Sequence, residues 1–296
     1  MAAAGPAETG ALVGNEEAVL AAAVREAGAA IRDKFAHGAQ VFTKADHSPV
    51  TEADLAANAI LVARLHAAYP ADAILSEEDP PAPDIAAAPR CWIIDPLDGT
   101  ASFVRREPTF AVMVALEVGG RPQVGAVYNP MSDELFTATA GRGARLAVGD
   151  ETAAPLRFTP VPVATARIGT TPGSFKTLAE GTPRWTGDLA RLHLSKRGFG
   201  FRPKALTDGR YDAFLGWLAD GGRSGGYAWD LCATDLIIHE AGGALTDVYG
   251  HPHRYARTHG RLYGGIVGSR DPALHAAVLA MLDTAGNTGD IHTTGG

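Results

Sequence analysis

The segment from Cys91 to Phe103 constrains the fold more than any other part of this chain. A short apolar run, 92–94, ends abruptly at Asp95 and Asp98, which are separated by Pro-Leu and followed by Gly-Thr. A buried strand that carries polar side chains at its carboxyl end is typical of open α/β sheets, which place their ligand sites at that edge. The segment therefore predicts a sheet with a polar group of residues at the end of one strand.

Two interpretations of Asp95 and Asp98 are open from these residues. Neighbouring carboxylates repel each other unless a cation or a proton lies between them, and a hard metal ion meets this need at neutral pH. A surface turn with solvated acids is a common alternative for a sequence of this type. The segment alone favours neither the turn nor the metal site.

Composition narrows the class of protein. The chain has 296 residues, of which 46% are apolar, so it can build a large core in one or two domains. Its net charge is -7, and no basic run is longer than the pair Arg105-Arg106. Binding to a nucleic acid polymer needs a Lys/Arg surface, so such a partner is not expected. A small anion needs only a few local groups.

The cysteines and the apolar runs bear on the compartment. Cys91 and Cys232 both fall in apolar segments, as small core residues do, and they indicate neither a disulfide framework nor a zinc site. The first fourteen residues lack the regions of a signal peptide, and no apolar run approaches membrane-spanning length. We therefore expect a cytoplasmic protein without a membrane partner.

The first part of the chain is predicted to form two helices and then strands. Apolar residues recur at spacings of four and three from Leu20 to Phe35, with Asn15 as the candidate cap, and a second helix fits about 52–69. Turn residues separate the later strands and predict an antiparallel meander. The predicted strands are 91–95, 110–118, 123–128 and 134–138.

Beyond a proline-rich stretch at about 155–162, strands alternate with helices. This change predicts an α+β half over 15–158 and an α/β half over 159–284. Residues 1–14 and 285–296 lack periodicity and are predicted to be disordered tails. The predicted strands of the second half are 165–169, 208–218 and 263–268, and its predicted helices are 174–180, 230–241 and 272–283.

Further acids lie at the ends of predicted elements. Glu77 follows an apolar pair at a strand end, although a solvated acidic loop explains it as well. Asp54 lies in the first turn of the second helix, where an acid also complements the helix dipole. Asp230 is well placed as an ordinary N-cap, with Gly242 as the helix stop. Only the combination of these acids points to a site.

This combination resembles the inositol monophosphatase superfamily of magnesium-dependent, lithium-sensitive phosphatases. The matching segments occur in the family's order between about residues 44 and 250, and the Asp-Pro-Leu-Asp-Gly-Thr and Trp-Asp motifs are highly specific. The resemblance implies a layered αβαβα sandwich, a phosphoric monoester hydrolase and a homodimer. The segments are Lys44 with 48–54, Ser76-Glu77-Glu78, Asp95-Pro96-Leu97-Asp98-Gly99-Thr100 with Phe103, and Trp229-Asp230 with 240–243.

The resemblance also implies two or three Mg²⁺ ions per active site. Glu77, Asp95 and the carbonyl of Leu97 would hold one ion. Asp95, Asp98 and Asp230 would hold a second, and Glu77 would assist with a looser third. Mg²⁺ prefers oxygen ligands and is completed by substrate phosphate. Two such ions can stabilise both the attacking and the leaving oxygens of an in-line displacement.

Catalytic roles follow from the same resemblance. Thr100 and Asp54 would orient and deprotonate the attacking water, with Glu77 as a further catalytic carboxylate. Gly99 and Thr100 would present backbone N–H groups to the phosphate at a helix start. No covalent phosphoenzyme is implied. The nearby Gly198-Phe199-Gly200 is not a dinucleotide fingerprint, because Pro203 stands where the third glycine belongs.

The substrate is indicated less sharply than the reaction. Residues 44–81 and 120–128 are most similar to bacterial 3'(2'),5'-bisphosphate nucleotidases, but Ala101-Ser102 stand where those enzymes usually carry Lys-Glu. Segment 229–243 is closer to histidinol-phosphate or inositol-phosphate members. The glutamate that contacts inositol hydroxyls in the family is replaced here by Gly216 or Arg223, which argues against inositol.

Three cations are candidates for contacting a second anionic group of a substrate. Arg223 lies in the glycine-rich stretch 218–227, which looks like an insertion, and Arg202 and Lys204 precede it. A flexible loop and ordinary surface charges explain them as well.

The leading hypothesis is therefore a Mg²⁺-dependent phosphomonoesterase for a small phosphate ester, a nucleotide such as a 3'(2'),5'-bisphosphate. The alternatives are an inositol, histidinol, sugar or specialised-metabolite monophosphatase and, from another class, a non-catalytic binding protein on this scaffold. The retained carboxylates oppose the last alternative, because clustered acids without a function only destabilise a fold.

Overall fold

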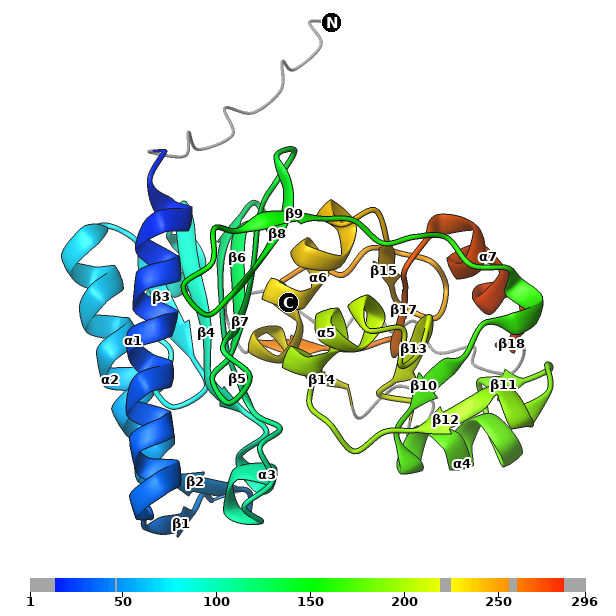
Figure 1. Ribbon diagram of the computed structural model, residues 1–296, viewed down its shortest axis with the longest axis horizontal. Coiled ribbons are helices and arrows are strands. Elements are labelled where there is room, and N and C mark those ends of the chain that lie inside the picture. The colour runs from blue at the N-terminus through cyan, green and yellow to red at the C-terminus, as the bar shows by residue number, and fades with distance from the viewer. Residues whose placement is uncertain (1–13, 46, 219–224, 256–259, 285–296) are drawn as a thin grey trace, which may run out of the picture.

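The computed structural model of this protein describes residues 14–45, 47–218, 225–255 and 260–284. Figure 1 shows layers in the order helix, sheet, helix, sheet, helix. This arrangement confirms the predicted αβαβα sandwich. The tails predicted at both ends fall mostly outside the described residues, as does most of the glycine-rich stretch 218–227.

Two long helices form the outer layer beside the first sheet. They are α1 (Glu16–His37) and α2 (Glu52–Ala68), which confirms both predicted helices. Leu20 and Ile31 on the apolar face of α1 are fully buried. Asn15 stands at the N-cap position, but its side chain makes no cap and instead accepts a 2.9 Å hydrogen bond from the Tyr69 hydroxyl. The expectation of a side-chain cap was therefore wrong.

The first sheet has seven strands and contains the predicted meander. Strand β3 pairs in parallel with β4, and every later pair in the sheet is antiparallel. The burial pattern of β8 does not alternate with a period of two, and the edge strand β9 has only three residues, so neither strand has a clear sequence signal. In sheet order the strands are β3 (Ala73–Ser76), β4 (Arg90–Asp98), β5 (Ala111–Val118), β6 (Arg121–Asn129), β7 (Glu134–Thr139), β8 (Gly143–Val148) and β9 (Ala154–Leu156).

The second sheet has five strands and is covered on its outer side by α4 (Pro172–Glu180) and α7 (Pro272–Ala280). The strand predicted at 208–218 is confined to four residues, because a left-handed turn at Gly209 precedes it. In sheet order the strands are β12 (Leu192–Leu194), β10 (Ile168–Thr170), β13 (Ala213–Gly216), β17 (Ile266–Ser269) and β15 (Ala244–Thr246).

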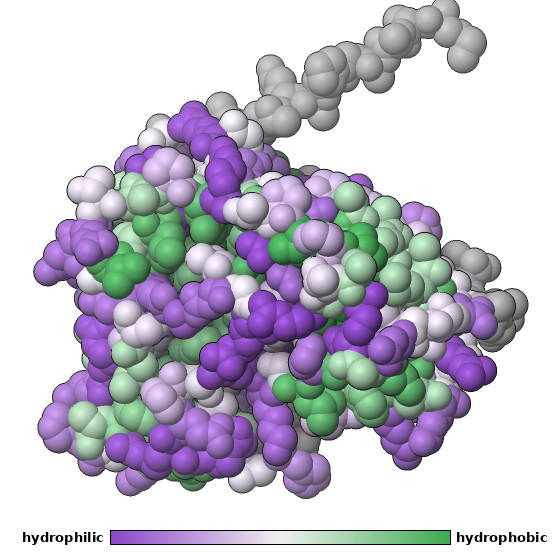
Figure 2. Space-filling model, turned by 45° about the vertical axis from the view of Figure 1, so that its right-hand side comes forward, coloured by the Kyte–Doolittle hydropathy of each residue, from purple (hydrophilic) through white to green (hydrophobic). Residues whose placement is uncertain are grey.

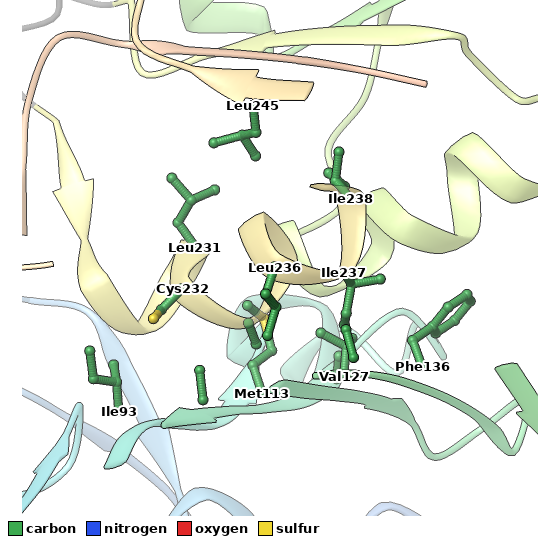
Figure 3. Packing of buried hydrophobic residues seen from close by; sticks show 14 of the residues in the cluster. Ile93, Met113, Val127, Phe136, Leu231, Cys232, Leu236, Ile237, Ile238 and Leu245 are labelled. Atoms are coloured by element: carbon green, nitrogen blue, oxygen red, sulfur yellow. The ribbon is translucent and has the colours of Figure 1, made fainter. Parts of the chain in front are cut away.

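Helix α6 (Ala228–Glu240) lies between the two sheets, and its apolar side chains point both ways (Figure 3). Leu236 and Ile237 face Met113 and Val127 of the first sheet, whereas Leu231 and Ile238 lie toward Leu245 of the second. A helix that is apolar all round is stable only when buried on all sides, which explains its central place. Cys232 on this helix and Cys91 on β4 are buried free thiols.

Short elements complete the fold. The boundary predicted at residue 158 falls between the end of β9 and the start of β10. The apolar cluster around α6 joins side chains of both sheets, so the division into two domains stays a prediction. These short elements are β1 (Val41–Thr43), β2 (Pro49–Thr51), α3 (Thr100–Val104), β11 (Arg184–Trp185), α5 (Arg202–Thr207), β14 (Gly226–Tyr227), β16 (Arg261–Leu262) and β18 (Leu282–Asp283).

The surface is mixed in character. On the face shown in Figure 2, patches of apolar side chains lie between hydrophilic ones. Of the helices that the structure describes, none is both long and apolar enough to cross a membrane.

Candidate active site

Strand β4 places Asp95 and Asp98 at its carboxyl end. The pairing of β4 with β5 becomes irregular between these two residues, so the strand departs from regular alternation there. The Leu97 amide donates a 3.0 Å hydrogen bond to Asp95 Oδ1, which holds that carboxylate in place. Gly99 follows at a φ of 96°, and a Cβ there would lie 2.9 Å from the Thr109 carbonyl oxygen, so only glycine suits this turn.

The N-terminus of α6 supplies the third carboxylate. One sequence interpretation made Asp230 the N-cap of α6, but Asp230 lies at the third helical position. Its Oδ2 accepts a 2.7 Å hydrogen bond from the amide of Tyr227, which is the N-cap residue. The carboxylates of Asp95, Asp98 and Asp230 thereby converge, with one oxygen of each lying within 4.8 Å of the others.

These three carboxylates are an electrostatically costly group without a cation. Asp95 is 1% exposed and Asp98 is 8% exposed. Burial raises the pKa of Asp98 to about 6 and that of Asp230 to about 8. Burial, followed by the charges of Glu77 and Asp98, raises the pKa of Asp95 well above its usual range. A hard divalent cation would remove this penalty, and a set of carboxylate oxygens is the donor set that Mg²⁺ prefers. The residues present therefore fit Mg²⁺.

Asp54 and Thr100 are brought together beside this group. Thr100 Oγ1 lies 2.8 Å from Asp54 Oδ1 and 3.2 Å from the Leu97 carbonyl oxygen, both of which accept. The other oxygen of Asp54 accepts from the amide and hydroxyl of Thr51, which completes a capping box at the start of α2. Asp54 is 1% exposed, and burial raises its pKa. The fold therefore holds a buried carboxylate of increased basicity against a hydroxyl.

Glu77 stands at the edge of the acidic group, where it pairs with a lysine. Its amide continues the β3–β4 pairing by donating to the Ile94 carbonyl. Lys44 Nζ lies 2.8 Å from both Glu77 Oε1 and Glu78 Oε1. Burial lowers the pKa of Lys44, but the charges and hydrogen bonds of the two glutamates outweigh it and raise that pKa. The sequence placed Lys44 in a matching motif without assigning it this ion pair.

Sequence analysis missed the contact between Gly198-Phe199-Gly200 and Asp98. The Gly200 amide donates a 2.8 Å hydrogen bond to Asp98 Oδ2. A Cβ on Gly198 would lie 2.1 Å from the same oxygen. The G-x-G pattern is the available signal in the sequence, although it does not fit a dinucleotide fingerprint. Its glycines instead allow the backbone to approach a carboxylate closely.

Arg202 is not available to a substrate, which corrects the sequence expectation. It is 1% exposed, and one guanidinium nitrogen donates a 2.6 Å hydrogen bond to the Tyr211 hydroxyl. The guanidinium lies 5.2 Å from the ring centres of both Phe199 and Phe214. Its charge also lowers the pKa of Asp98, against the larger effect of burial. Arg202 therefore has a structural place behind the acidic group.

The other two candidate cations, Lys204 and Arg223, are not assigned to a substrate contact either. Lys204 Nζ is paired with Glu134 at 2.7 Å and with Asp208 at 3.1 Å. Arg223 lies outside the described residues. A second anionic group would need other partners among the described residues.

Comparison with known proteins identifies the family and the fold. The sequence profile described as the inositol monophosphatase family matches residues 15–286. This chain belongs to that family. The resemblance is thereby confirmed, and the family member is a phosphoric monoester hydrolase of a magnesium-dependent class.

Individual relatives cover most of this family member. Nus factor SuhB of Salmonella typhimurium (strain LT2) is 32% identical over 272 residues, which are 88% of this chain and 93% of that protein. The extragenic suppressor protein suhB from Bartonella henselae superposes with a TM-score of 0.69 at 25% identity and covers 89% of this chain and 96% of that chain. Mycobacterium tuberculosis SuhB superposes with a TM-score of 0.65 at 26% identity, covering 90% and 94%.

Proposed function

We propose that this family member hydrolyses a small phosphate ester by direct attack of water, with Mg²⁺ held at the carboxyl end of β4. The observation that supports this most is the convergence of Asp95, Asp98 and Asp230, with one oxygen of each within 4.8 Å of the others. Two buried carboxylates and one half-buried carboxylate, all of raised pKa, form a poor surface turn but a good cation site.

Metal binding divides between two groups of residues. Asp95, Asp98 and Asp230 hold one ion, and Glu77, Asp95 and the Leu97 carbonyl hold another. Glu77 also assists with a third, looser ion. When bound, Mg²⁺ supplies Lewis-acid polarisation of the phosphoryl group and makes water easier to deprotonate.

The protein's own groups orient the phosphate and move the proton. The first N–H groups of a helix lack intrahelical acceptors, and those of Gly99 and Thr100 bind the phosphate oxygens. Thr100 Oγ1 orients the attacking water and takes its proton, while the Thr100 proton passes along the 2.8 Å hydrogen bond to Asp54 Oδ1. The leaving oxygen takes a proton from solvent, and the phosphate leaves without bonding covalently to the protein.

The substrate that we propose is a nucleotide such as a 3'(2'),5'-bisphosphate. It is supported by the similarity of residues 44–81 and 120–128 to bacterial bisphosphate nucleotidases. The alternative within the same reaction is an inositol, histidinol, sugar or specialised-metabolite monophosphate, and the segment 229–243 favours the histidinol or inositol members of this set. A non-catalytic binding role is the alternative from another class, and the name Nus factor of the Salmonella relative keeps it in view.

Phosphate release tests the reaction and the substrate together. Purified protein with Mg²⁺ is offered adenosine 3',5'-bisphosphate, inositol 1-phosphate, histidinol phosphate and glucose 1-phosphate. We expect release from at least one ester and none in excess chelator. Release that persists in the chelator would refute the metal-dependent reaction. No release from any ester, with Mg²⁺ binding intact, would favour the binding role.

The assembly and location that we propose rest on the resemblance and on the sequence expectations. They are a homodimer and the cytoplasm. Light scattering of the purified protein decides the first, and a single-chain mass at working concentration would contradict it.

A further inference from the structure

A cationic hollow lies beside the acidic group. Two adjoining cavities of about 580 and 610 Å³ share Glu107, Ser195, Lys196 and Arg197 in their walls. Each volume falls in the range of about 300–1,000 Å³ that is typical of small-molecule sites. Arg105 lines the smaller cavity, and Arg210 lines the larger one. This lining contrasts with the chain as a whole, whose net charge is -7.

The hollow opens directly onto the residues proposed to bind the phosphate. Gly99, whose N–H is proposed to bind the hydrolysed phosphate, lines the smaller cavity together with Ser102 and Gly198. Lys196 and Arg197 immediately precede Gly198, and the Gly200 amide is bonded to Asp98 at 2.8 Å. The two cations are therefore carried on the same short segment that contacts Asp98.

Lys196 and Arg197 are available to a ligand. Among the described residues, neither side chain forms an ion pair, whereas Arg105 is engaged with Glu107 through two hydrogen bonds of 3.1 and 2.9 Å. Arg197 is half-buried, and its guanidinium lies 5.6 Å from the centre of the Phe201 ring. Burial and the charge of Arg210 lower the pKa of Arg197. An anion between these cations would relieve their mutual repulsion.

We infer that Lys196 and Arg197 form a subsite for a second phosphate group of the substrate, beside the phosphate that is hydrolysed. This inference rests on the proposed phosphatase function and deepens it, since it assigns to this hollow the role that Arg202, Lys204 and Arg223 were expected to play. Leu194 is 62% exposed and lines the larger cavity, where it offers an apolar surface to the rest of the ligand. A nucleoside bisphosphate combines these properties, because it has two phosphates and an apolar base face.

The test compares two substrates that differ by one phosphate. Adenosine 3',5'-bisphosphate and adenosine 3'-monophosphate share the ester to be cleaved, and kcat and KM for each are measured with Mg²⁺. In the double variant Lys196→Ala/Arg197→Ala we expect KM for the bisphosphate to rise at least about tenfold, because charge-assisted hydrogen bonds are lost. The constants for the monophosphate should change by less than about twofold.

One control variant keeps a cation in the hollow, and the other removes a cation elsewhere on the surface. Lys196→Arg keeps a cation in the hollow and should keep most of the preference for the bisphosphate. Arg142→Ala removes an exposed cation from the turn between β7 and β8, and it should leave the constants for both substrates unchanged. An equal rise of KM for both substrates in the double variant would overturn the inference while leaving the phosphatase function in place.

Two further measurements separate the remaining outcomes. Inorganic phosphate that inhibits both reactions in the wild type but not in the double variant would assign the hollow to a free anion and overturn the inference. Calorimetric titration with adenosine 3',5'-bisphosphate tests the subsite without turnover. Affinity that falls in the double variant supports the subsite, and unchanged affinity overturns it. If the wild type releases no phosphate from any ester, the proposed function fails, yet the titration still decides the subsite.

Discussion

Thr100 Oγ1 lies 2.8 Å from Asp54 Oδ1, although the two residues are 46 positions apart in the chain. The hydroxyl belongs to the first residue of α3, and the carboxylate belongs to the first turn of α2. Thr51 occupies the other oxygen of Asp54, so the carboxylate can turn only a little. One carboxylate oxygen of Asp54 therefore accepts from Thr100, which is the arrangement that a proton relay needs.

Removal of the Thr100 hydroxyl should therefore stop turnover without removing the cap of α2. In Thr100→Val we expect kcat to fall by about 10²–10⁴-fold, which is the usual contribution of general acid–base catalysis. Thr100→Ser keeps the hydroxyl and should retain most of the activity. Steady-state phosphate release measures both variants, and circular dichroism confirms their folding. Wild-type kcat in Thr100→Val would exclude Thr100 from proton transfer.

The acidic group should make the metal-free protein less stable at high pH. The pKa of Asp98 is raised to about 6 from an ordinary value of 3.8. The folded state therefore binds the proton more tightly, and the stability that this proton contributes is complete below pH 3.8 and is lost as the pH rises through about 6. At pH 8 without metal, Asp98→Asn should be more stable than the wild type by on the order of 2 kcal/mol.

Thermal unfolding at several pH values, with chelator or with Mg²⁺, measures this effect. The advantage of Asp98→Asn should shrink toward pH 4, and Mg²⁺ should raise the Tm of the wild type more than that of the variant. Turnover of Asp98→Asn should be lost although its fold is intact. A variant that is less stable than the metal-free wild type at pH 8 would contradict the view of Asp98 as a strained buried carboxylate.

A methyl group at Gly198 should disturb Asp98 directly. The added Cβ would lie 2.1 Å from Asp98 Oδ2, so either the carboxylate or the segment that carries it must move. We expect Gly198→Ala to reduce kcat by at least about tenfold, because a small misplacement of a catalytic group is costly. Gly173→Ala is the matched control, since its Cβ would meet nothing within 4 Å. Equal activity of the two variants would show that Asp98 tolerates displacement.

Arg202 should affect stability rather than the choice of substrate. Its guanidinium is enclosed by Phe199, Tyr211 and Phe214 and bonds the Tyr211 hydroxyl. Arg202→Met should lower the free energy of unfolding by about 1–3 kcal/mol, through the lost hydrogen bond and the altered packing. The ratio of kcat/KM for the bisphosphate to that for the monophosphate should stay constant. A selective loss of the bisphosphate reaction would return Arg202 to the substrate site.

Local patterns in the sequence were sufficient for most of the architecture. The periodicity from Leu20 to Phe35 and over about 52–69 predicted the outer helices, and the turn residues between the strands predicted at 110–118, 123–128 and 134–138 predicted the meander, which the structure confirms. The apolar run before Asp95 predicted a buried strand with acids at its end, as β4 shows. Such patterns are readable because hydrophobic periodicity is set by neighbouring residues. Strands β8 and β9 were not predicted, because β8 does not alternate between buried and exposed positions and β9 is an edge strand of only three residues.

Only the tertiary structure decided which charges meet. Sequence order says nothing of the convergence of Asp230 with Asp95 and Asp98, which the resemblance alone implied and which the placement of α6 between the sheets brings about. Sequence order also does not show that Arg202 is buried among aromatic rings, whereas Lys196 and Arg197 line an open hollow. Burial, pairing and pKa depend on residues far apart in the chain. The acids of the site could therefore be predicted from the sequence, whereas the roles of the cations beside them depend on how those side chains pack in the structure.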